Sequence, residues 1–303
     1  MALLRAGYSD LFFSNALPVL EDIIMAQYGG KPDMIPMVYN VQSSDKWGEQ
    51  STTITGFNVA PRKNENAAVT YDDVMQGYDQ TYTHLTYALA FRVSKEMIDD
   101  EKWGLIKKAA QSLGFSMFNT RQITAANTFN NAFDNAFTGP DGLELCSTVH
   151  PLIGGGTEQN ELTAAADLSV TSLRQALNDL EDTVDERGLL VNVMPRYLLV
   201  PNELIWDAEE LLKSSLRPDT ANNPINAFQI KNLDYMVWNY LTDADAWFLV
   251  SDKPDHSLMF YEREPVNVSS DYDFEADASK TKIRCRFSVG WSDWRGVFGS
   301  PGA

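Results

Sequence analysis

The feature that most constrains this fold is a stretch without proline, residues 105–135. Its apolar residues recur at helical spacing along two stripes, and Gly114 is its only glycine. As one helix, the stretch would span roughly 45 Å at 1.5 Å per residue. Because this is long for a compact domain, the sequence predicts an elongated molecule with the helix as its spine. Gly114 suggests a point where that helix could bend.

The rest of the chain is typical of a globular protein. Its 303 residues, 44% hydrophobic and 22% charged, are enough for a sizeable core. No run approaches the roughly 18 apolar residues of a membrane span, and no secretory signal is recognisable. The two cysteines, Cys146 and Cys285, lie far apart in the sequence, which fits free thiols in a reducing cytoplasm.

The formal net charge of −18 is concentrated in one part of the chain. Residues 139–260 hold 20 acidic and 7 basic side chains, a balance of −13. Such a surface repels phosphate, so tight nucleic-acid binding through this region is disfavoured. We interpret the acidity mainly as a source of solubility.

Near the N-terminus, apolar residues at helical spacing predict a short helix that starts near Leu17 and ends at Gly29-Gly30. We expect this helix to belong to an N-terminal arm more than to the core. Two β-prone runs, 51–55 and 67–71, then flank a polar segment, 61–66. This pattern is typical of a long exposed hairpin. Because so polar a segment cannot build its own core, it must lie on another surface. The residues expected to contact that surface are at its tip: Arg62, Lys63 and Glu65.

After an alternating strand over 79–93, the sharpest local signal comes near the C-terminus. Two rows of charge alternate with other residues, as expected for two strands of one hairpin. A turn at Ala278-Ser279 would place an acid opposite a base four times, in the pairs Asp277–Lys280, Glu275–Lys282, Asp273–Arg284 and Asp271–Arg286. Such pairs fix strand register, so the sequence predicts this charge ladder.

No set of residues predicts a catalytic, cofactor or metal site. The histidines are His84, His150 and His256, and although His150 follows Cys146 by four residues, no second ligand pair completes a zinc site. Alternate acids along a strand lie about 7 Å apart, too far for the acidic row to share one calcium ion. No nucleophile elbow or phosphate loop occurs. The expectation is a protein that is not an enzyme.

Four stretches resemble the major head subunit of Mu-like phages and, more broadly, the Hong Kong-type tailed-phage capsid fold: 141–151, 199–204 leading into 208–211, 245–250 and 294–300. The resemblance implies an α+β fold with an N-terminal arm, an extended hairpin called the E-loop, a peripheral domain with a long spine helix, and an axial domain. The corresponding boundaries are 1–47 for the arm, 48–78 for the E-loop, 79–138 with 261–303 for the peripheral domain, and 139–260 for the axial domain.

The resemblance also implies a function. A subunit of this kind assembles into pentamers and hexamers of an icosahedral shell around double-stranded DNA. Its partners would be further copies of itself, a portal, and scaffolding or decoration proteins, with only loose, non-specific proximity to the DNA and no membrane. It would occur in the virion, and in the host cytoplasm during assembly. In this context a bend at Gly114 would assist rearrangement of the shell.

Two other functions remain open at this point. An encapsulin-like compartment subunit would share the fold and hold cargo enzymes in place of DNA. A soluble α/β hydrolase would need a nucleophile or a metal set, and the sequence shows neither pattern.

Overall fold

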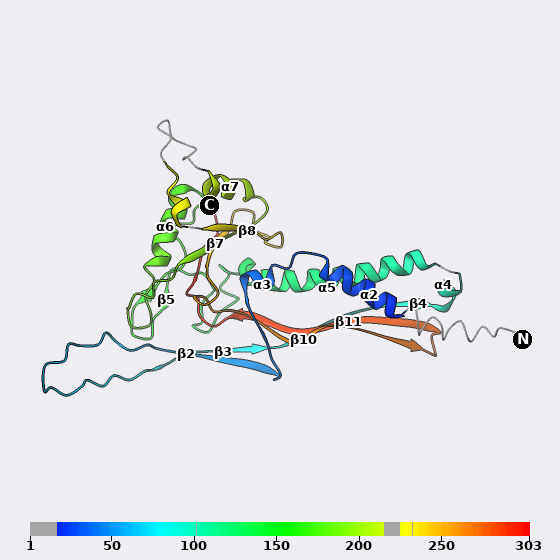
Figure 1. The fold of residues 1–303 in the computed structure, drawn as a ribbon, viewed down its shortest axis with the longest axis horizontal. Coiled ribbons are helices and arrows are strands. Elements are labelled where there is room, and N and C mark those ends of the chain that lie inside the picture. The colour runs from blue at the N-terminus through cyan, green and yellow to red at the C-terminus, as the bar shows by residue number, and fades with distance from the viewer. Residues whose placement is uncertain (1–16, 101, 215–224, 232) are drawn as a thin grey trace, which may run out of the picture.

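The computed structural model describes residues 17–100, 102–214, 225–231 and 233–303. It is an elongated molecule with two four-stranded sheets and a hairpin that projects beyond them (Figure 1). We call the two sheets the long sheet and the short sheet. Within the described residues, no helix is both long and apolar enough to cross a bilayer.

The long sheet has the strand order β1-β10-β11-β4. Its strands are β1 (Asn40–Ser43), β10 (Leu258–Asp273), β11 (Ala278–Trp291) and β4 (Leu85–Ser94). Strand β1 runs parallel to β10, and the other neighbours are antiparallel. The spine helix α5 (Trp103–Asn130) lies along one face, with α2 (Leu17–Gly29) beside it (Figure 1). The predicted spine helix is therefore confirmed, with bounds of 103–130 in place of 105–135.

The core between α5 and the long sheet is apolar and rich in aromatic rings. Phe287 on β11 stacks on Phe260 of the neighbouring β10 at 5.1 Å and on Tyr87 of β4 at 4.7 Å. At the end of α5, Phe129 packs edge-on against Phe248 of the short sheet at 5.2 Å. The spine helix thus contributes to the cores of both sheets.

The segment 17–43 is a core element, which corrects the prediction that all of 1–47 forms an arm. Leu20 and Ile24 on α2 are buried against α5, and Tyr39 is fully buried with its hydroxyl donating to the carbonyl O of Ala125. Between these, α3 (Ile35–Val38) leads into β1. The apolar side chains that recur at helical spacing in this segment are thus buried within their own chain. Residues 1–16 of the predicted arm lie outside the described residues.

Gly114 permits a close approach between two helices. A Cβ at this position would lie 2.4 Å from the carbonyl O of Ile24 on α2. Helix α5 continues through Gly114 from Trp103 to Asn130 without a break. Close packing is therefore a sufficient reason for this glycine, and a bend is not needed to explain it.

We expect Gly114→Ala to lower the free energy of unfolding by about 1–3 kcal/mol, because the new methyl group must push α2 away from α5. Gly104→Ala in the same helix is the matched control. No atom lies within 4 Å of a Cβ at Gly104, so helix propensity alone should raise stability by up to about 1 kcal/mol. Urea unfolding of the purified protein measures both. Equal effects of the two substitutions would contradict the packing role.

The short sheet has the order β12-β9-β7-β8. Its strands are β12 (Val297–Ser300), β9 (Trp247–Ser251), β7 (Pro195–Val200) and β8 (Asp234–Val237). One face packs on the helices α6 (Val170–Glu181) and α7 (Ile205–Lys213), with η2 (Ala227–Lys231) nearby, and the other packs on the end of α5. Because β12 pairs with β9, the C-terminal strand belongs to this sheet. The single assignment of 261–303 to the peripheral domain therefore needs correction at this end.

The hairpin of β10 and β11 forms, but the predicted charge ladder is wrong in register. The turn comprises residues 274–277, so Asp271 lies opposite Lys280, Ser269 opposite Lys282, Asn267 opposite Arg284, and Glu264 opposite Arg286. Two ion pairs do form on this face, Lys280–Asp273 at 2.5 Å and Arg284–Glu264 at 3.3 Å. Exposed ion pairs are weak. The register instead aligns buried residues, such as Leu258 opposite Trp291, at the far end of the strands.

The remaining short elements are α4 (Lys95–Asp99), which follows β4, and the two-residue strands β5 (His150–Pro151) and β6 (Thr157–Glu158). The projecting hairpin is built on β2 (Gly48–Ile54) and β3 (Gln76–Thr83). His84 separates β3 from β4, so the single strand predicted over 79–93 is two strands in line.

Candidate assembly surface

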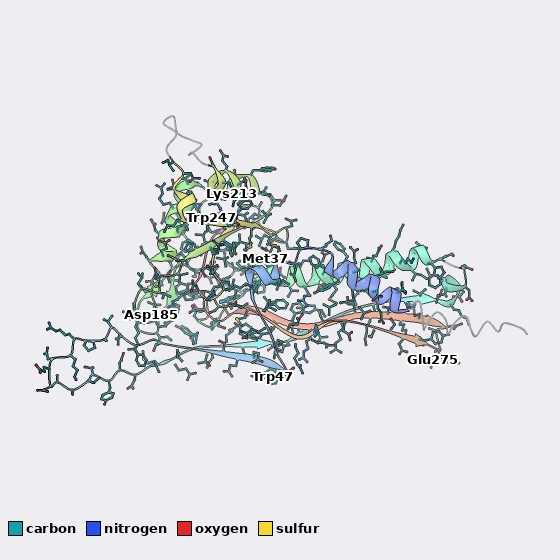
Figure 2. The ribbon with its side chains drawn as sticks, viewed as in Figure 1. Met37, Trp47, Asp185, Lys213, Trp247 and Glu275 are labelled. Carbon is teal, nitrogen blue, oxygen red and sulfur yellow. The ribbon has the colours of Figure 1, made fainter. Side chains whose placement is uncertain are left out.

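The projecting hairpin is an open loop beyond its first few residues. Strands β2 and β3 pair as far as Ile54 and Gln76, and the bond from Thr55 N to Met75 O closes this ladder at 2.9 Å. We call residues 56–75 the extended loop. Every residue in it is exposed, and its two arms spread apart away from the rest of the molecule (Figure 2). Within the described residues, the backbone of 56–74 makes one backbone–backbone hydrogen bond, from Ala67 N to Asn64 O at the tip.

Apolar side chains alternate along both arms of the extended loop. Phe57 and Val59 lie on the first arm, and Val69 and Tyr71 on the second, with Tyr71 94% exposed. The charge pattern of the sequence pointed only to the tip and gave no indication of these four residues. Their i, i+2 spacing was the available signal. Arg62, Lys63 and Glu65 are exposed at the tip as expected, and their role as contacts stays a prediction.

The base of the extended loop, which we call its root, is held by hydrogen bonds to other parts of the same chain. The guanidinium of Arg187 donates to the carboxylate of Asp72 at 3.1 Å and to the carbonyl O of Asp73, and Tyr78 donates to the carbonyl O of Pro151. Hydrogen bonding from the Asn58 backbone and from Arg187 lowers the pKa of Asp72. These contacts position the root and leave the arms and tip in solvent.

A buried cluster supports Arg187 from behind. Arg295 donates to Glu186 at 2.9 Å and lies over the Trp294 ring at 4.6 Å, and the His150 ring stacks on the same indole at 4.4 Å. Glu186 also accepts from the backbone N of Ile153. Glu186, the residue before Arg187, is thus held in place by Arg295 of the C-terminal segment.

His150, whose spacing from Cys146 did not complete a zinc site, is fully buried between two protein partners. Its Nδ1 lies 2.6 Å from Asp141 and its Nε2 lies 2.9 Å from Asn160 Oδ1. Asn160 Nδ2 donates to the carbonyls of Leu145 and Val297, so Oδ1 must face His150 and Nε2 is the donor. The ring is therefore part of a structural network. In the part of the chain that the structure describes, no group of three or more His, Cys, Asp or Glu could hold a metal ion.

Where β3 leads into β4, polar groups connect the hairpin to the long sheet. His84 contacts the hydroxyls of Ser288 at 2.9 Å and Ser44 at 3.1 Å, and Ser44 donates to Glu49. Burial and the nearby Arg286 lower the pKa of His84, which favours the neutral ring. Tyr82 and Ser292 share a further buried hydrogen bond of 2.6 Å. The direction in which the extended loop projects is thus set by contacts within one subunit.

His256, the third histidine, gives the subunit a pH dependence. Burial, followed by the positive charge of Lys253, lowers its pKa to about 4, against an unperturbed value near 6.5. The unfolded chain therefore binds more protons between these values, and stability falls as the pH drops through this window. At pH 5 the loss is about 2 kcal/mol relative to pH 7.5.

His256→Asn should remove this loss, because the Asn side-chain oxygen can still accept the hydrogen bond that Nδ1 accepts from Leu258 N. Urea unfolding of the unassembled subunit at pH 7.5 and at pH 5, for wild type and variant, is the measurement. Other titrating groups affect both proteins equally and cancel in the comparison. If both proteins lose the same stability, His256 is not the source.

Comparisons with known proteins agree with this architecture. The phage capsid protein family model matches residues 77–299. Among curated proteins, none matches the sequence. The virus-like particle from Pyrococcus furiosus has a similar structure at 10% identity, with a TM-score of 0.57 over 94% of this chain and 99% of that one.

Two further structures share the fold. The procapsid of bacteriophage JBD30 aligns at 15% identity with a TM-score of 0.52, over 96% of this chain and 75% of that one. The capsid of a native GTA particle aligns at 11% identity with a TM-score of 0.56, over 88% and 89% of the two chains. These likenesses confirm the predicted α+β, Hong Kong-type capsid fold. Since its family model covers most of the sequence, the chain belongs to the phage capsid protein family.

Proposed function

We propose that the protein is the major capsid subunit of a tailed phage, which assembles into pentamers and hexamers of an icosahedral shell around double-stranded DNA. One observation carries the proposal. Twenty residues, 56–75, are held out in solvent with exposed apolar side chains and almost no backbone pairing of their own. Ordering such a segment costs conformational entropy without burying apolar surface in the same chain. Contact with neighbouring copies supplies the missing burial.

Several finer assignments belong to this proposal. The long sheet with α5 forms the peripheral domain, and the short sheet with α6 and α7 forms the axial domain. The extended loop is the E-loop, and Arg62, Lys63 and Glu65 lie at the rim of its contact with a neighbouring subunit. A portal and scaffolding or decoration proteins are its other partners, and the motifs at 141–151 and 294–300 support a Mu-like head subunit. The protein would act without catalysis, in the virion and, during assembly, in the host cytoplasm.

The family match favours this proposal over both alternatives. An encapsulin-like compartment shares the fold, but the matching family is that of phage capsid proteins. A hydrolase would need a catalytic cleft, whereas the buried histidines, His84, His150 and His256, are engaged with structural partners.

Gel filtration and negative-stain microscopy of the purified full chain, expressed alone and with its neighbouring genes, test the proposal. We expect megadalton particles of uniform diameter in at least one of these preparations. A monodisperse small oligomer in all of these preparations, at protein concentrations high enough for capsid assembly, would contradict the proposal.

A further inference from the structure

A single arginine attaches the arms of the extended loop to the rest of their own subunit. Arg187 Nη1 lies 3.1 and 3.2 Å from the two carboxylate oxygens of Asp72, and its Nη2 donates to the carbonyl O of Asp73. Within the described residues, every hydrogen bond and ion pair between 56–74 and other parts of the chain involves this side chain. Asp72 also accepts from the backbone N of Asn58 on the first arm, at 2.8 Å. The contact with Arg187 therefore holds both arms.

The turn that carries Arg187 has a fixed shape. Asp185 Oδ1 accepts from the backbone N of Arg187 and from that of Leu189, each at 2.8 Å. Gly188 closes the turn with a φ of +80°, in the left-handed region that favours glycine. On the other side, Glu186 is held by Arg295, as described above. The guanidinium thus extends from a rigid support, and its side chain is only 10% exposed.

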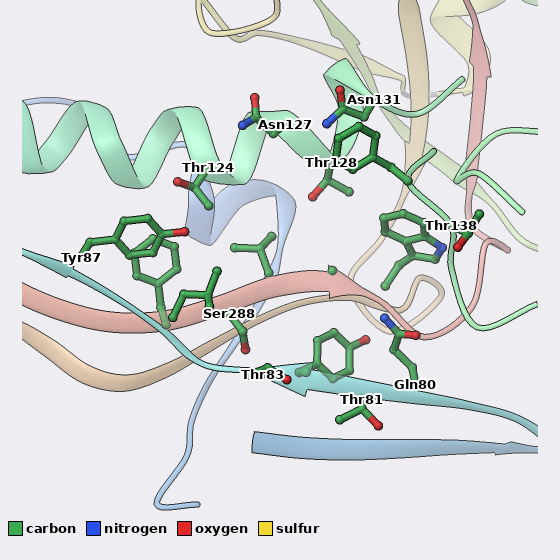
Figure 3. Close-up of a pocket in the computed structure, with 17 residues that line it drawn as sticks. Gln80, Thr81, Thr83, Tyr87, Thr124, Asn127, Thr128, Asn131, Thr138 and Ser288 are labelled. Carbon is green, nitrogen blue, oxygen red and sulfur yellow. The ribbon is translucent and has the colours of Figure 1, made fainter. Parts of the chain in front are cut away.

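The spine helix gives the projecting hairpin little support. Strands β2 and β3 form a separate two-stranded sheet, and such a ribbon is marginally stable by itself. A groove of about 410 Å³ lies between β3 and the C-terminal half of α5, with Gln80 and Thr83 on one side and Thr124 and Asn127 on the other (Figure 3). Because this groove separates β3 from the helix, the direction of the hairpin depends on its few polar contacts.

The charges next to Arg187 are negative on both sides of the contact. Asp72 and Asp73 belong to the loop, and Asp185 belongs to the turn. The first arm passes close to that turn, since a Cβ at Gly56 would lie 3.4 Å from Asp185 Oδ2. Charge-assisted hydrogen bonds to the guanidinium are strong, whereas like charges repel. Without the Arg187 side chain, the acidic root would lie beside an acidic turn with no cation to join them.

We infer that Arg187 is the positioning residue of the extended loop and fixes the direction in which both arms project. Without it, the arms change direction at Thr55 and Met75, where the ladder of β2 and β3 ends. For its consequence this inference rests on the proposed function. A shell of uniform size needs every copy to present the same contact surface in the same way. One residue of the turn therefore controls how uniformly the copies assemble.

The distance between two spin labels in the unassembled subunit tests the direction of the arms. Val69→Cys in the second arm and Trp206→Cys on α7 are both exposed positions for labelling, and the native Cys146 and Cys285 are buried. The doubly labelled subunit should give one narrow distribution of distances. Adding Arg187→Ala should broaden it about twofold or more, because the arms then regain conformational freedom.

Two further variants make this measurement specific. Arg196→Ala is the matched control, because Arg196 on β7 forms an ion pair with Asp252 in the short sheet, at 3.8 Å, and its loss should leave the distribution unchanged. Asp72→Ala removes the Arg187 contact from the loop side and touches no core residue. It should broaden the distribution about as much as Arg187→Ala. The double variant should broaden it no further, because both substitutions break one contact.

Negative-stain microscopy of Arg187→Ala measures the consequence for assembly. We expect particles of mixed diameter, or fewer particles, from a subunit whose melting temperature stays within a few degrees of wild type. Narrow distance distributions in Arg187→Ala and Asp72→Ala would overturn the inference whether or not shells form. Uniform shells at wild-type yield from Arg187→Ala would overturn its link to assembly. If the distributions broaden but wild type forms no particles in any preparation, Arg187 still positions the loop and the proposed function fails.

Discussion

Replacing residues 56–74 with Asn-Gly should abolish particle formation while the subunit stays folded. The hydrogen bond from Thr55 N to Met75 O places these residues side by side, so a two-residue turn can connect them. The deleted segment contributes no buried side chain to either core. Its contacts with its own subunit are limited to the root, chiefly Arg187 with Asp72 and Asp73. Assembly, in contrast, loses every contact that the extended loop makes with neighbours.

The effect on assembly should be close to all-or-none, because a shell forms only when many repeated contacts act together. Gel filtration gives the particle fraction, and thermal unfolding should give a melting temperature within a few degrees of wild type. The control is the triple variant Arg62→Ala, Lys63→Ala, Glu65→Ala, which keeps the backbone and the four apolar side chains. Charges at the rim of an interface contribute modestly, so this variant should still form particles. Normal shells from the shortened chain would refute a role for the extended loop in assembly.

The second large effect is expected inside the subunit. Asn160→Leu should cost on the order of 5 kcal/mol, a substantial part of the stability of a domain. Asn160 is buried, and its side chain satisfies four separate groups: the backbone N of Ser147, Nε2 of His150, and the carbonyls of Leu145 and Val297. Leucine is similar in size and leaves all four unpaired. Each buried group without a partner costs about 1–3 kcal/mol.

Urea unfolding of the unassembled subunit measures this loss, with Asn267→Leu as the matched control. Asn267 lies exposed on β10, so the same substitution there should change stability by less than about 0.5 kcal/mol. Similar midpoints for both variants would show that Asn160 does not hold the network together. If the Asn160→Leu protein aggregates while the Asn267→Leu control behaves like wild type, this result also agrees with the prediction.

Some of the fold could be read from local sequence patterns. The helices at 17–29 and 103–130 appear at nearly the predicted positions, because helical periodicity depends on residues three and four apart. The projecting hairpin was also predictable, because the polar segment 61–66 had no apolar residue to bury. The short motifs led to the correct family. Within the extended loop, however, attention to charge selected Arg62, Lys63 and Glu65 and overlooked the alternating Phe57, Val59, Val69 and Tyr71.

Features that depend on partners distant in the sequence were not accessible in this way. Asn160 looked like any loop residue until the fold brought Leu145 and Val297 to its side chain. The four-residue spacing from Cys146 to His150 did not complete a zinc site, but it also did not reveal that the imidazole would contact Asp141 and Asn160. The role of Gly114 depends on the carbonyl O of Ile24, ninety residues earlier.

The sequence by itself determined the spine helix and the exposed hairpin, since each is encoded in the spacing of neighbouring residues. It also indicated the family, through the resemblance of short motifs to phage capsid proteins. Only the tertiary structure decided the register of β10 against β11, the placement of 17–43 in the core, and the position of β12 in the short sheet. The physical reason is the same in each case. Burial of apolar side chains by distant segments contributes more free energy than local charge pairing, and a local pattern does not reveal which segments will meet.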